Sequence, residues 1–214
     1  MRKTSFAEGE FYHVYNRGVD KRDIFSEQYD LSRFLQSMRE FNTLEPIGSI
    51  YEKTLLKIKF GSSTPKLVDV ICYCLNPNHY HFILRQTADK GIEKFMHRLA
   101  TGYTNYFNEK YQRSGALFQG RYKAVHIDSN EYLLHLSAYV NLNHLVHQLG
   151  SSASKTSWDE FVEDTGNLES LCSKGIILEQ FSSLSEYKNF AKESLKDILE
   201  RRKMAKEFEE LLLE

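Results

Sequence analysis

Two segments joined by a short turn constrain this chain most, because they predict a pair of adjacent strands inside a core. The segment Val68–Leu75 is an almost continuous apolar run, which is typical of a strand that is central in a sheet. A turn at Asn76-Pro77-Asn78 follows, and His79–Gln86 then continues as a second strand. Two buried strands cannot cover themselves, so the other elements must pack around them.

The segments on either side of this hairpin predict further strands and helices. Strands are expected at 11–19 and 117–127, and residues 51–60 are expected to form a strand or part of a helix. Apolar residues at helical spacing predict helices at 26–43 and 91–111, and Asn130 is expected to cap a third helix that runs to about residue 148. This order predicts an α+β fold, in which helices pack on an antiparallel sheet.

The chain divides into two parts at about residue 150. Residues 1–150 hold all eight histidines and the predicted sheet, so we expect any chemistry there. Residues 151–175 resemble a loop-rich wrap, and the chain from Leu178 onward is expected to be mostly helical. We therefore assign residues 151–214 to a helical C-terminal extension. It could pack on the core, form a dimer or bind a partner, and packing is the expectation.

The composition is that of an ordinary globular protein. Hydrophobic residues make up 41% of the chain, and no apolar stretch is long enough to span a bilayer. The first residues have no apolar signal core, and the odd count of three cysteines fits a reducing compartment, so we expect a cytoplasmic protein with no membrane partner. The net charge of −1 argues against indiscriminate binding of nucleic acid. A local phosphate-binding groove is still compatible with it.

His79 and His81 are the first candidate ligands. Alternation along a strand places both imidazoles on one face, with Tyr80 on the other. Two nitrogen ligands on a rigid strand are a start for a divalent metal site, although two packing histidines would give the same pattern. Cys72 and Cys74 offer an alternative zinc site with these histidines, but four ligands on flat neighbouring strands do not form a tetrahedron.

The predicted helix after Asn130 offers the remaining groups of a site. Tyr139 and Asn143 are four residues apart and therefore lie on one face of a helix. Packed on the sheet, that helix could supply Asn143 as an oxygen ligand and bring the Tyr139 hydroxyl beside the metal. A core tyrosine is the alternative. Tyr132 competes as the reactive tyrosine, but its partner four residues on is a leucine. His135 is a candidate proton acceptor.

Four motifs in order resemble the HUH endonucleases with a single catalytic tyrosine, and most closely the REP-associated, or insertion-sequence-type, tyrosine transposases. They are Phe11-Tyr12-His13-Val14 with Asn16-Arg17-Gly18, Asn76-Pro77-Asn78-His79-Tyr80-His81, Gly115-Ala116-Leu117-Phe118-Gln119-Gly120-Arg121-Tyr122-Lys123, and Tyr132-Leu133-Leu134 with Tyr139-Val140-Asn141-Leu142-Asn143. Two positions depart from the family pattern. Tyr80 replaces an aliphatic residue between the histidines, and His144 replaces a proline after Asn143. Neither change removes a proposed ligand or the nucleophile.

The resemblance implies a ferredoxin-like, or RRM-like, HUH fold and a definite chemistry. Tyr139 would be the nucleophile, and His79, His81 and Asn143 would bind Mg²⁺ or Mn²⁺. The enzyme would cleave single-stranded DNA near a hairpin through a 5′-phosphotyrosine link and transfer the strand. It would act as a monomer or homodimer, in a prokaryotic cytoplasm and on the nucleoid when bound to DNA. A replication initiator or relaxase, or a non-catalytic protein that binds DNA hairpins, is the alternative.

Candidate DNA contacts lie at the ends and edges of the predicted strands. Asn16, Arg17, Arg121 and Lys123 could bind phosphates, and Phe118 or Tyr122 could stack on a base. A solvated rim of the sheet is the alternative for all of them.

Overall fold

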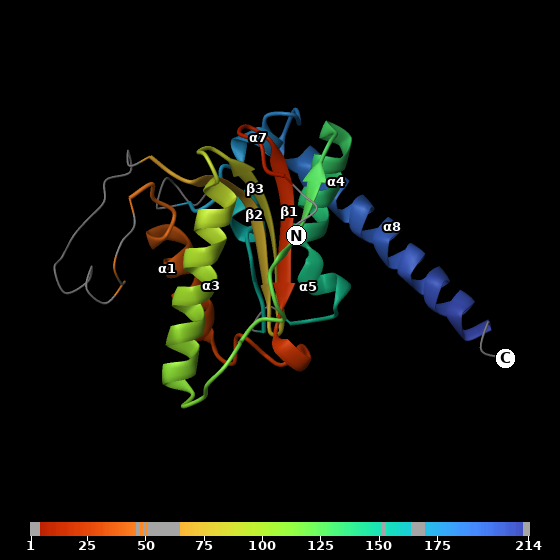
Figure 1. Ribbon diagram of the computed structural model, residues 1–214. Helices are drawn as coiled ribbons and strands as arrows, with labels where there is room; N and C mark the ends of the chain where they lie inside the picture. Colours follow the sequence, from red (N-terminus) through yellow and green to blue (C-terminus); the bar gives the residue numbers. More distant parts are fainter. Residues whose placement is uncertain are drawn as a thin grey trace.

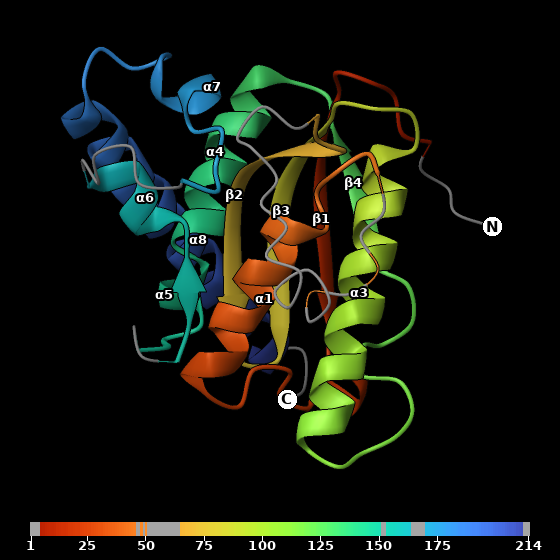
Figure 2. The same cartoon turned by 90° about the vertical axis from the view of Figure 1, so that its left-hand side faces the viewer.

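The computed structural model describes residues 5–45, 48, 50, 65–150, 153–163 and 170–211, with the backbone alone for 205–211. A five-stranded antiparallel sheet lies between two layers of helices (Figure 1). Turned by 90°, helices α1 and α3 lie in front of the sheet, and α4 lies behind it (Figure 2). The predicted α+β fold is therefore confirmed. The uncertain segment 51–60 lies outside the described residues.

The sheet has the order β4-β1-β3-β2-β5. Its strands are β1 (Phe11–Arg17), β2 (Val68–Asn76), β3 (His79–Gln86), β4 (Lys123–Ile127) and β5 (Lys155–Thr156). The hairpin of β2 and β3 forms as predicted, and an irregularity in register between Val70 and Cys72 interrupts the pairing. The strand predicted at 117–127 begins only at Lys123, because Gly120 has a positive φ of 66° that breaks the extended backbone.

Helices α1 (Gln28–Glu40) and α3 (Gly91–Lys110) cover one face of the sheet. Their apolar residues recur at helical spacing, and the most buried of them pack against the even-numbered side chains of β3. The Phe34 ring lies 5.8 Å from the Tyr80 ring and 6.2 Å from the Phe82 ring, measured between centroids. This packing fixes the pleat of β3, because it turns the odd-numbered side chains to the opposite face.

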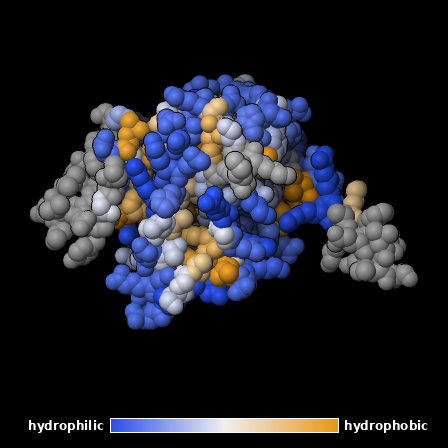
Figure 3. Space-filling model, viewed as in Figure 1, coloured by the Kyte–Doolittle hydropathy of each residue, from blue (hydrophilic) through white to orange (hydrophobic). Residues whose placement is uncertain are grey.

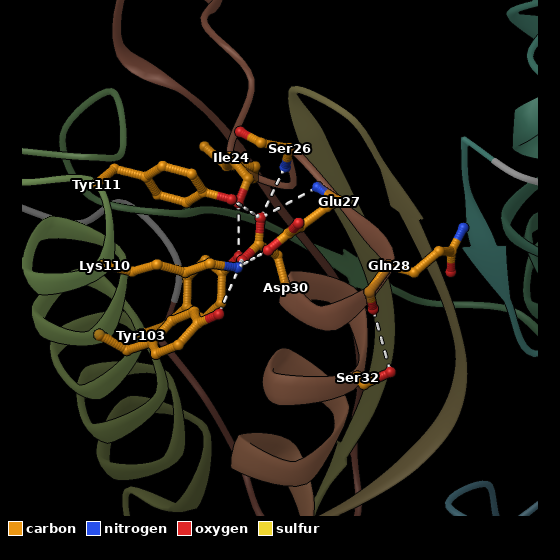
Figure 4. Close-up of polar contacts among 10 residues, drawn as sticks. Ile24, Ser26, Glu27, Gln28, Asp30, Ser32, Tyr103, Lys110 and Tyr111 are labelled. Carbon is orange, nitrogen blue, oxygen red and sulfur yellow. Dashed lines mark hydrogen bonds and ion pairs between the residues drawn. The ribbon is translucent and has the colours of Figure 1, made fainter.

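A buried carboxylate joins the start of α1 to the end of α3 (Figure 4). Asp30 is fully buried, and it accepts hydrogen bonds from the Ser26 and Glu27 amides at 2.9 and 3.2 Å. From α3 and the residue after it, Tyr106, Lys110 and Tyr111 donate to the same carboxylate at 2.7–2.8 Å. A buried charge is tolerated only when it is paired and hydrogen-bonded. The contacts therefore hold these helices together on their side of the sheet.

The opposite face is covered by α4 (Asn130–Asn141) and the short α5 (Asn143–Val146). The prediction of one helix from Asn130 to about residue 148 is wrong, because the helix is interrupted at Leu142. Its cap is Ser129, not Asn130, and the Ser129 hydroxyl accepts a hydrogen bond from the Tyr132 amide at 3.2 Å. The interruption places Asn143 at the start of a new helical turn.

The C-terminal extension contributes to the same body. Its strand β5 pairs with β2, and α6 (Trp158–Val162) and α7 (Gly175–Leu178) follow. The long α8 (Leu184–Leu211) packs on α4 and α5 and then projects away from them toward the C-terminus (Figure 1). The surface in this view is mostly hydrophilic, with hydrophobic atoms also exposed along the projecting part of α8 (Figure 3). No helix of the described residues is long and apolar enough to cross a membrane.

Candidate active site

The two histidines of β3 lie among polar side chains from both neighbouring strands. On β1, Tyr15 pairs with His81 and Arg17 pairs with His79; on β2, Cys74 pairs with His81 and Asn76 with His79. Residues directly opposite in an antiparallel sheet project to the same face. The register therefore gathers the histidines and these four side chains on the face that α4 covers.

A cavity of about 690 Å³ opens at this end of the sheet. His79 and His81 line it together with Tyr139 of α4, and the Tyr139 and His81 ring centroids are 5.8 Å apart in an edge-on contact. The other lining residues come from the end of β1 and the loops near it, from the start of β4, and from the helices beyond α4: Tyr15, Asn16, Arg17, Lys21, Asn78, Gln119, Lys123, His147 and Arg202. One chain thus brings the predicted nucleophile to the predicted ligands.

Hydrogen bonds made by Nδ1 orient both imidazoles. His79 Nδ1 donates to Asn78 Oδ1 at 2.6 Å, which leaves a lone pair on His79 Nε2. His81 Nδ1 lies 2.9 Å from Nε2 of His13, the buried histidine of β1. The tautomer with the proton on His81 Nδ1 likewise leaves a lone pair on its Nε2. Metal-binding histidines in proteins usually donate their other nitrogen in this way.

The lone pairs of His79 and Asn143 converge on one point. The Asn76 amide nitrogen donates to His79 Nε2 at 2.8 Å and to Asn143 Oδ1 at 2.7 Å, and these two acceptors are 3.4 Å apart. Asn143 is fully buried, and its Nδ2 has no hydrogen-bond partner among the described residues. His79 Nε2 and Asn143 Oδ1 are thus placed so that both could bind one cation. The cation would take the place of the Asn76 N–H groups that these two atoms now accept.

The sequence left two metal sites open, a zinc site of Cys72, Cys74 and the two histidines and a site of the two histidines with Asn143. The side chains that lie close together in the structure distinguish between them. The described residues contain no cluster of three His, Cys, Asp or Glu side chains that could hold a metal ion, so the Cys₂His₂ zinc site does not form. The Cys74 thiol is fully buried and lies 3.3 Å from Asn76 Oδ1. Burial raises the pKa of this thiol, which opposes a thiolate ligand. Two imidazoles and an amide oxygen remain as the candidate ligands.

Burial sets the protonation of the site. It lowers the pKa of His79 to about 4, and the charge of Arg202 and the proton that His147 takes up in acid act in the same direction. It also lowers the pKa of His13 to about 4 and that of His81 well below its usual value. These imidazoles are therefore neutral at pH 7, the form that binds metals. Burial raises the pKa of Tyr139, while the neighbouring Asn143 amide and the charge of Arg202 oppose that rise.

The charge of the cavity differs from that of the whole chain. Arg17, Lys21, Lys123 and Arg202 line it, and the described lining contains no carboxylate, although the chain has a net charge of −1. Of the predicted DNA contacts, Asn16, Arg17 and Lys123 are among the lining residues. Gln119, which was not among the predicted DNA contacts, accepts a hydrogen bond from the Arg17 guanidinium. The cavity is thus suited to an anionic ligand.

Five predicted residues do not line this cavity: the fully buried Asn143 and the four described next. Phe118 is buried against Tyr80, with ring centroids 5.8 Å apart, so it belongs to the core and has no free face for a base. Tyr122 is half-buried against that core, and Arg121 is exposed outside the lining. His135 lies near α8, where its Nδ1 is 3.1 Å from the Ser194 hydroxyl, and it lines a different cavity together with Tyr132.

Comparison with known proteins fits this arrangement. Residues 47–164 match the family described as "Transposase IS200 like", which is more than half of the chain. The chain belongs to this family. A search of curated proteins finds no match. Among solved structures, this IS200-like transposase is similar to a REP-associated tyrosine transposase bound to a REP hairpin, with a TM-score of 0.50, 11% identity, and coverage of 80% of this chain and 88% of the other. At that identity the likeness shows a shared fold.

Family membership makes the protein a DNA-processing enzyme of the transposase type and confirms the resemblance inferred from the four motifs. The structure adds residues that the motifs did not reveal. Tyr15 lines the cavity and stacks near His81, with centroids 5.6 Å apart, so it replaces Tyr132 as the competing tyrosine of this IS200-like transposase. The sequence could have indicated this role, because Tyr15 and His13 alternate along β1 and so lie on the same face of the strand. Lys21, Asn78, His147 and Arg202 also line the cavity.

Proposed function

We propose that this protein is a metal-dependent transposase that cleaves single-stranded DNA near a hairpin and rejoins it through a 5′-phosphotyrosine intermediate on Tyr139. The observation that carries the proposal is that Tyr139 and the two histidines of β3, far apart in sequence, line one cationic cavity. The hairpin substrate rests on the family and on the DNA hairpin bound by the structural relative.

In the proposed reaction, the Tyr139 oxygen forms a bond to a backbone phosphorus, and the bond from that phosphorus to the 3′ oxygen breaks. The phenolic proton passes to water, and the released 3′ oxygen takes up a proton to become a hydroxyl. One phosphodiester replaces another, so no energy source is needed, and a 3′ hydroxyl can reverse the step to join strands. Only about 0.1% of a tyrosine with a pKa near 10 is ionised at pH 7. The reaction therefore needs help with charge.

The chain supplies part of that help. Asn143 and Arg202 both favour the ionised form of Tyr139, and Arg17, Lys21 and Lys123 attract the DNA phosphates. His79, His81 and Asn143 would hold a Mg²⁺ or Mn²⁺ ion, which when bound polarises a non-bridging phosphate oxygen and orients the scissile group. Imidazole and amide ligands suit Mn²⁺ at least as well as Mg²⁺. The neutral imidazoles need no deprotonation before they bind the ion.

The test is covalent capture of labelled single-stranded hairpin oligonucleotides, with Mn²⁺ or with a chelator. We expect a protein–DNA adduct with the unmodified protein and none with Tyr139→Phe or with the chelator. Tyr15→Phe and Tyr132→Phe are matched controls that should keep the adduct, because Tyr15 is the other tyrosine of the cavity and Tyr132 lines a different one. An adduct that persists in Tyr139→Phe would contradict the nucleophile. DNA binding without any adduct, across a broad oligonucleotide pool, would favour a non-catalytic hairpin-binding protein.

A further inference from the structure

The C-terminal helix α8 brings a cation to the active-site cavity. Arg202 lines this cavity together with His79 and Tyr139, although it lies 63 residues after Tyr139 in the chain. The other cations of the lining come from the sheet side: Arg17 from the end of β1, Lys21 from the turn after it and Lys123 from the start of β4. Arg202 is thus the only described cation on the α5 and α8 side of the cavity.

The packing of α8 determines where Arg202 points. Tyr187, Ala191 and Ser194 are the buried residues of the face that lies against α4. Arg202 lies eleven residues after Ala191, close to three full turns, so it follows the Ala191 edge of that face, whereas Arg201 lies seven residues after Ser194 and follows the opposite edge. The neighbouring Arg201 points elsewhere, into the second cavity with Tyr132 and His135. Direction on the helix, and not charge alone, distinguishes the two arginines.

One hydrogen bond fixes the guanidinium and leaves most of it available. Arg202 Nη1 donates to the Val146 carbonyl, the last residue of α5, at 3.0 Å. An arginine has five N–H donors in a planar fork that matches two phosphate oxygens. The Arg202 charge also acts on Tyr139, where it opposes the rise in the pKa of the phenol. The guanidinium therefore lines the cavity within electrostatic reach of the proposed nucleophile, and the bond to Val146 is its one hydrogen bond among the described residues.

We propose that Arg202 binds the DNA phosphate that Tyr139 attacks, so that the C-terminal extension completes the active site of its own chain. This inference rests on the proposed function and adds the residue that contacts the reacting phosphate from the side opposite to Arg17, Lys21 and Lys123. The extension, which carries an excess of acidic residues, then has a specific role in catalysis besides packing.

The first test measures binding of the single-stranded hairpin oligonucleotide by Tyr139→Phe, which cannot form an adduct, in the presence of Mn²⁺ and at several salt concentrations. For single strands, each phosphate contact contributes about 0.7 to the slope of log K against log salt. Adding Arg202→Gln should lower this slope by about 0.7, and adding Arg201→Gln should leave it unchanged. Arg202→Lys keeps the charge and should restore most of the slope. Thermal unfolding of each variant checks that α8 remains docked.

The second test locates the contact. An oligonucleotide with one neutral methylphosphonate at the mapped cleavage position should bind to Tyr139→Phe less tightly than the unmodified oligonucleotide does. Adding Arg202→Gln should abolish most of this difference in affinity between the two oligonucleotides. Adding Arg201→Gln should leave the difference in place. In the chain with Tyr139 intact, Arg202→Gln should slow adduct formation on the order of 100-fold, the typical cost of losing one donor to a developing negative charge. Equal slopes, equal methylphosphonate effects or equal adduct rates for the two arginine variants would overturn the inference. The proposed function fails separately, if the unmodified protein forms no adduct on DNA.

Discussion

The hydrogen bond between His81 and His13 makes a quantitative prediction about metal binding. His13 is buried on β1, and its Nε2 lies 2.9 Å from His81 Nδ1. His13→Phe keeps an aromatic ring of similar size but removes the acceptor. Loss of such a partner to a metal-binding histidine typically lowers metal affinity 10- to 100-fold, about 1.4–2.8 kcal/mol. We expect the dissociation constant for Mn²⁺ to rise by that factor.

The assay is a Mn²⁺ titration of the DNA-free protein followed by electron paramagnetic resonance, in which the free ion gives the signal. Its readout does not depend on catalysis. His13→Gln offers a carbonyl oxygen in place of Nε2 and should recover part of the affinity. His126→Phe is the matched control, because His126 is an exposed histidine that pairs with Glu10 at the far strand β4. His13→Phe with unchanged affinity, or His126→Phe with the same loss, would refute the reasoning.

Two further predictions concern the assembly of the site and the stability of the fold. Tyr139 and His81 line one cavity within a single chain, so a mixture of the Tyr139→Phe and His81→Ala variants should form no adduct; recovery of the adduct on mixing would show that two chains share a site. Asp30→Asn should lower the free energy of unfolding at pH 7 by about 1–3 kcal/mol, measured by urea denaturation, because it disrupts a buried, charge-assisted network. Burial raises the pKa of this carboxyl, but hydrogen bonds from Lys110, Tyr111, Tyr106 and the Ser26 amide outweigh it and hold the pKa below its usual value. Asp30 therefore contributes its full stabilisation above a pH of about 4, its pKa in the unfolded chain, and loses it as the pH falls further. The difference in unfolding free energy between the unmodified protein and Asp30→Asn should then shrink in acid. A difference that stays constant with pH would contradict this account.

Much of the sheet could be predicted because its strands have strong local patterns. The hairpin of β2 and β3 and the helix α3 have the expected bounds within one residue. The alternation of His79 and His81 with Tyr80 also places these side chains on the expected faces, because one face packs on Phe34 and the other on α4. In these elements the repeat of the apolar residues, every two residues in a strand or every 3.6 in a helix, is enough to predict the element and its buried face.

The helix break at Leu142 could not be predicted, since its cause lies outside the local sequence. The Asn141 side chain donates to the Tyr187 hydroxyl at 2.9 Å and accepts from Ser157 at 2.6 Å. Both partners belong to the extension, and tertiary contacts of this kind override helix propensity. The contribution of Arg202 was hidden for the same reason. Its position depends on how α8 packs, and a charged residue on a long helix usually indicates only a solvated face.

These contacts connect the extension to the nucleophile as well as to the phosphate. The proposed ligands His79 and His81 lie on β3, which has hydrogen-bonded neighbours on both sides and cannot shift without breaking them. Tyr139 has no such support from the sheet, because it lies on α4 two residues before Asn141. The bonds from Asn141 to Tyr187 and Ser157 fix that end of α4, and the bond from Arg202 to Val146 fixes α5 just beyond it. The rate of a catalysed reaction falls sharply when reacting groups are misplaced by even about 1 Å. The extension therefore positions the half of the site that the sheet does not hold.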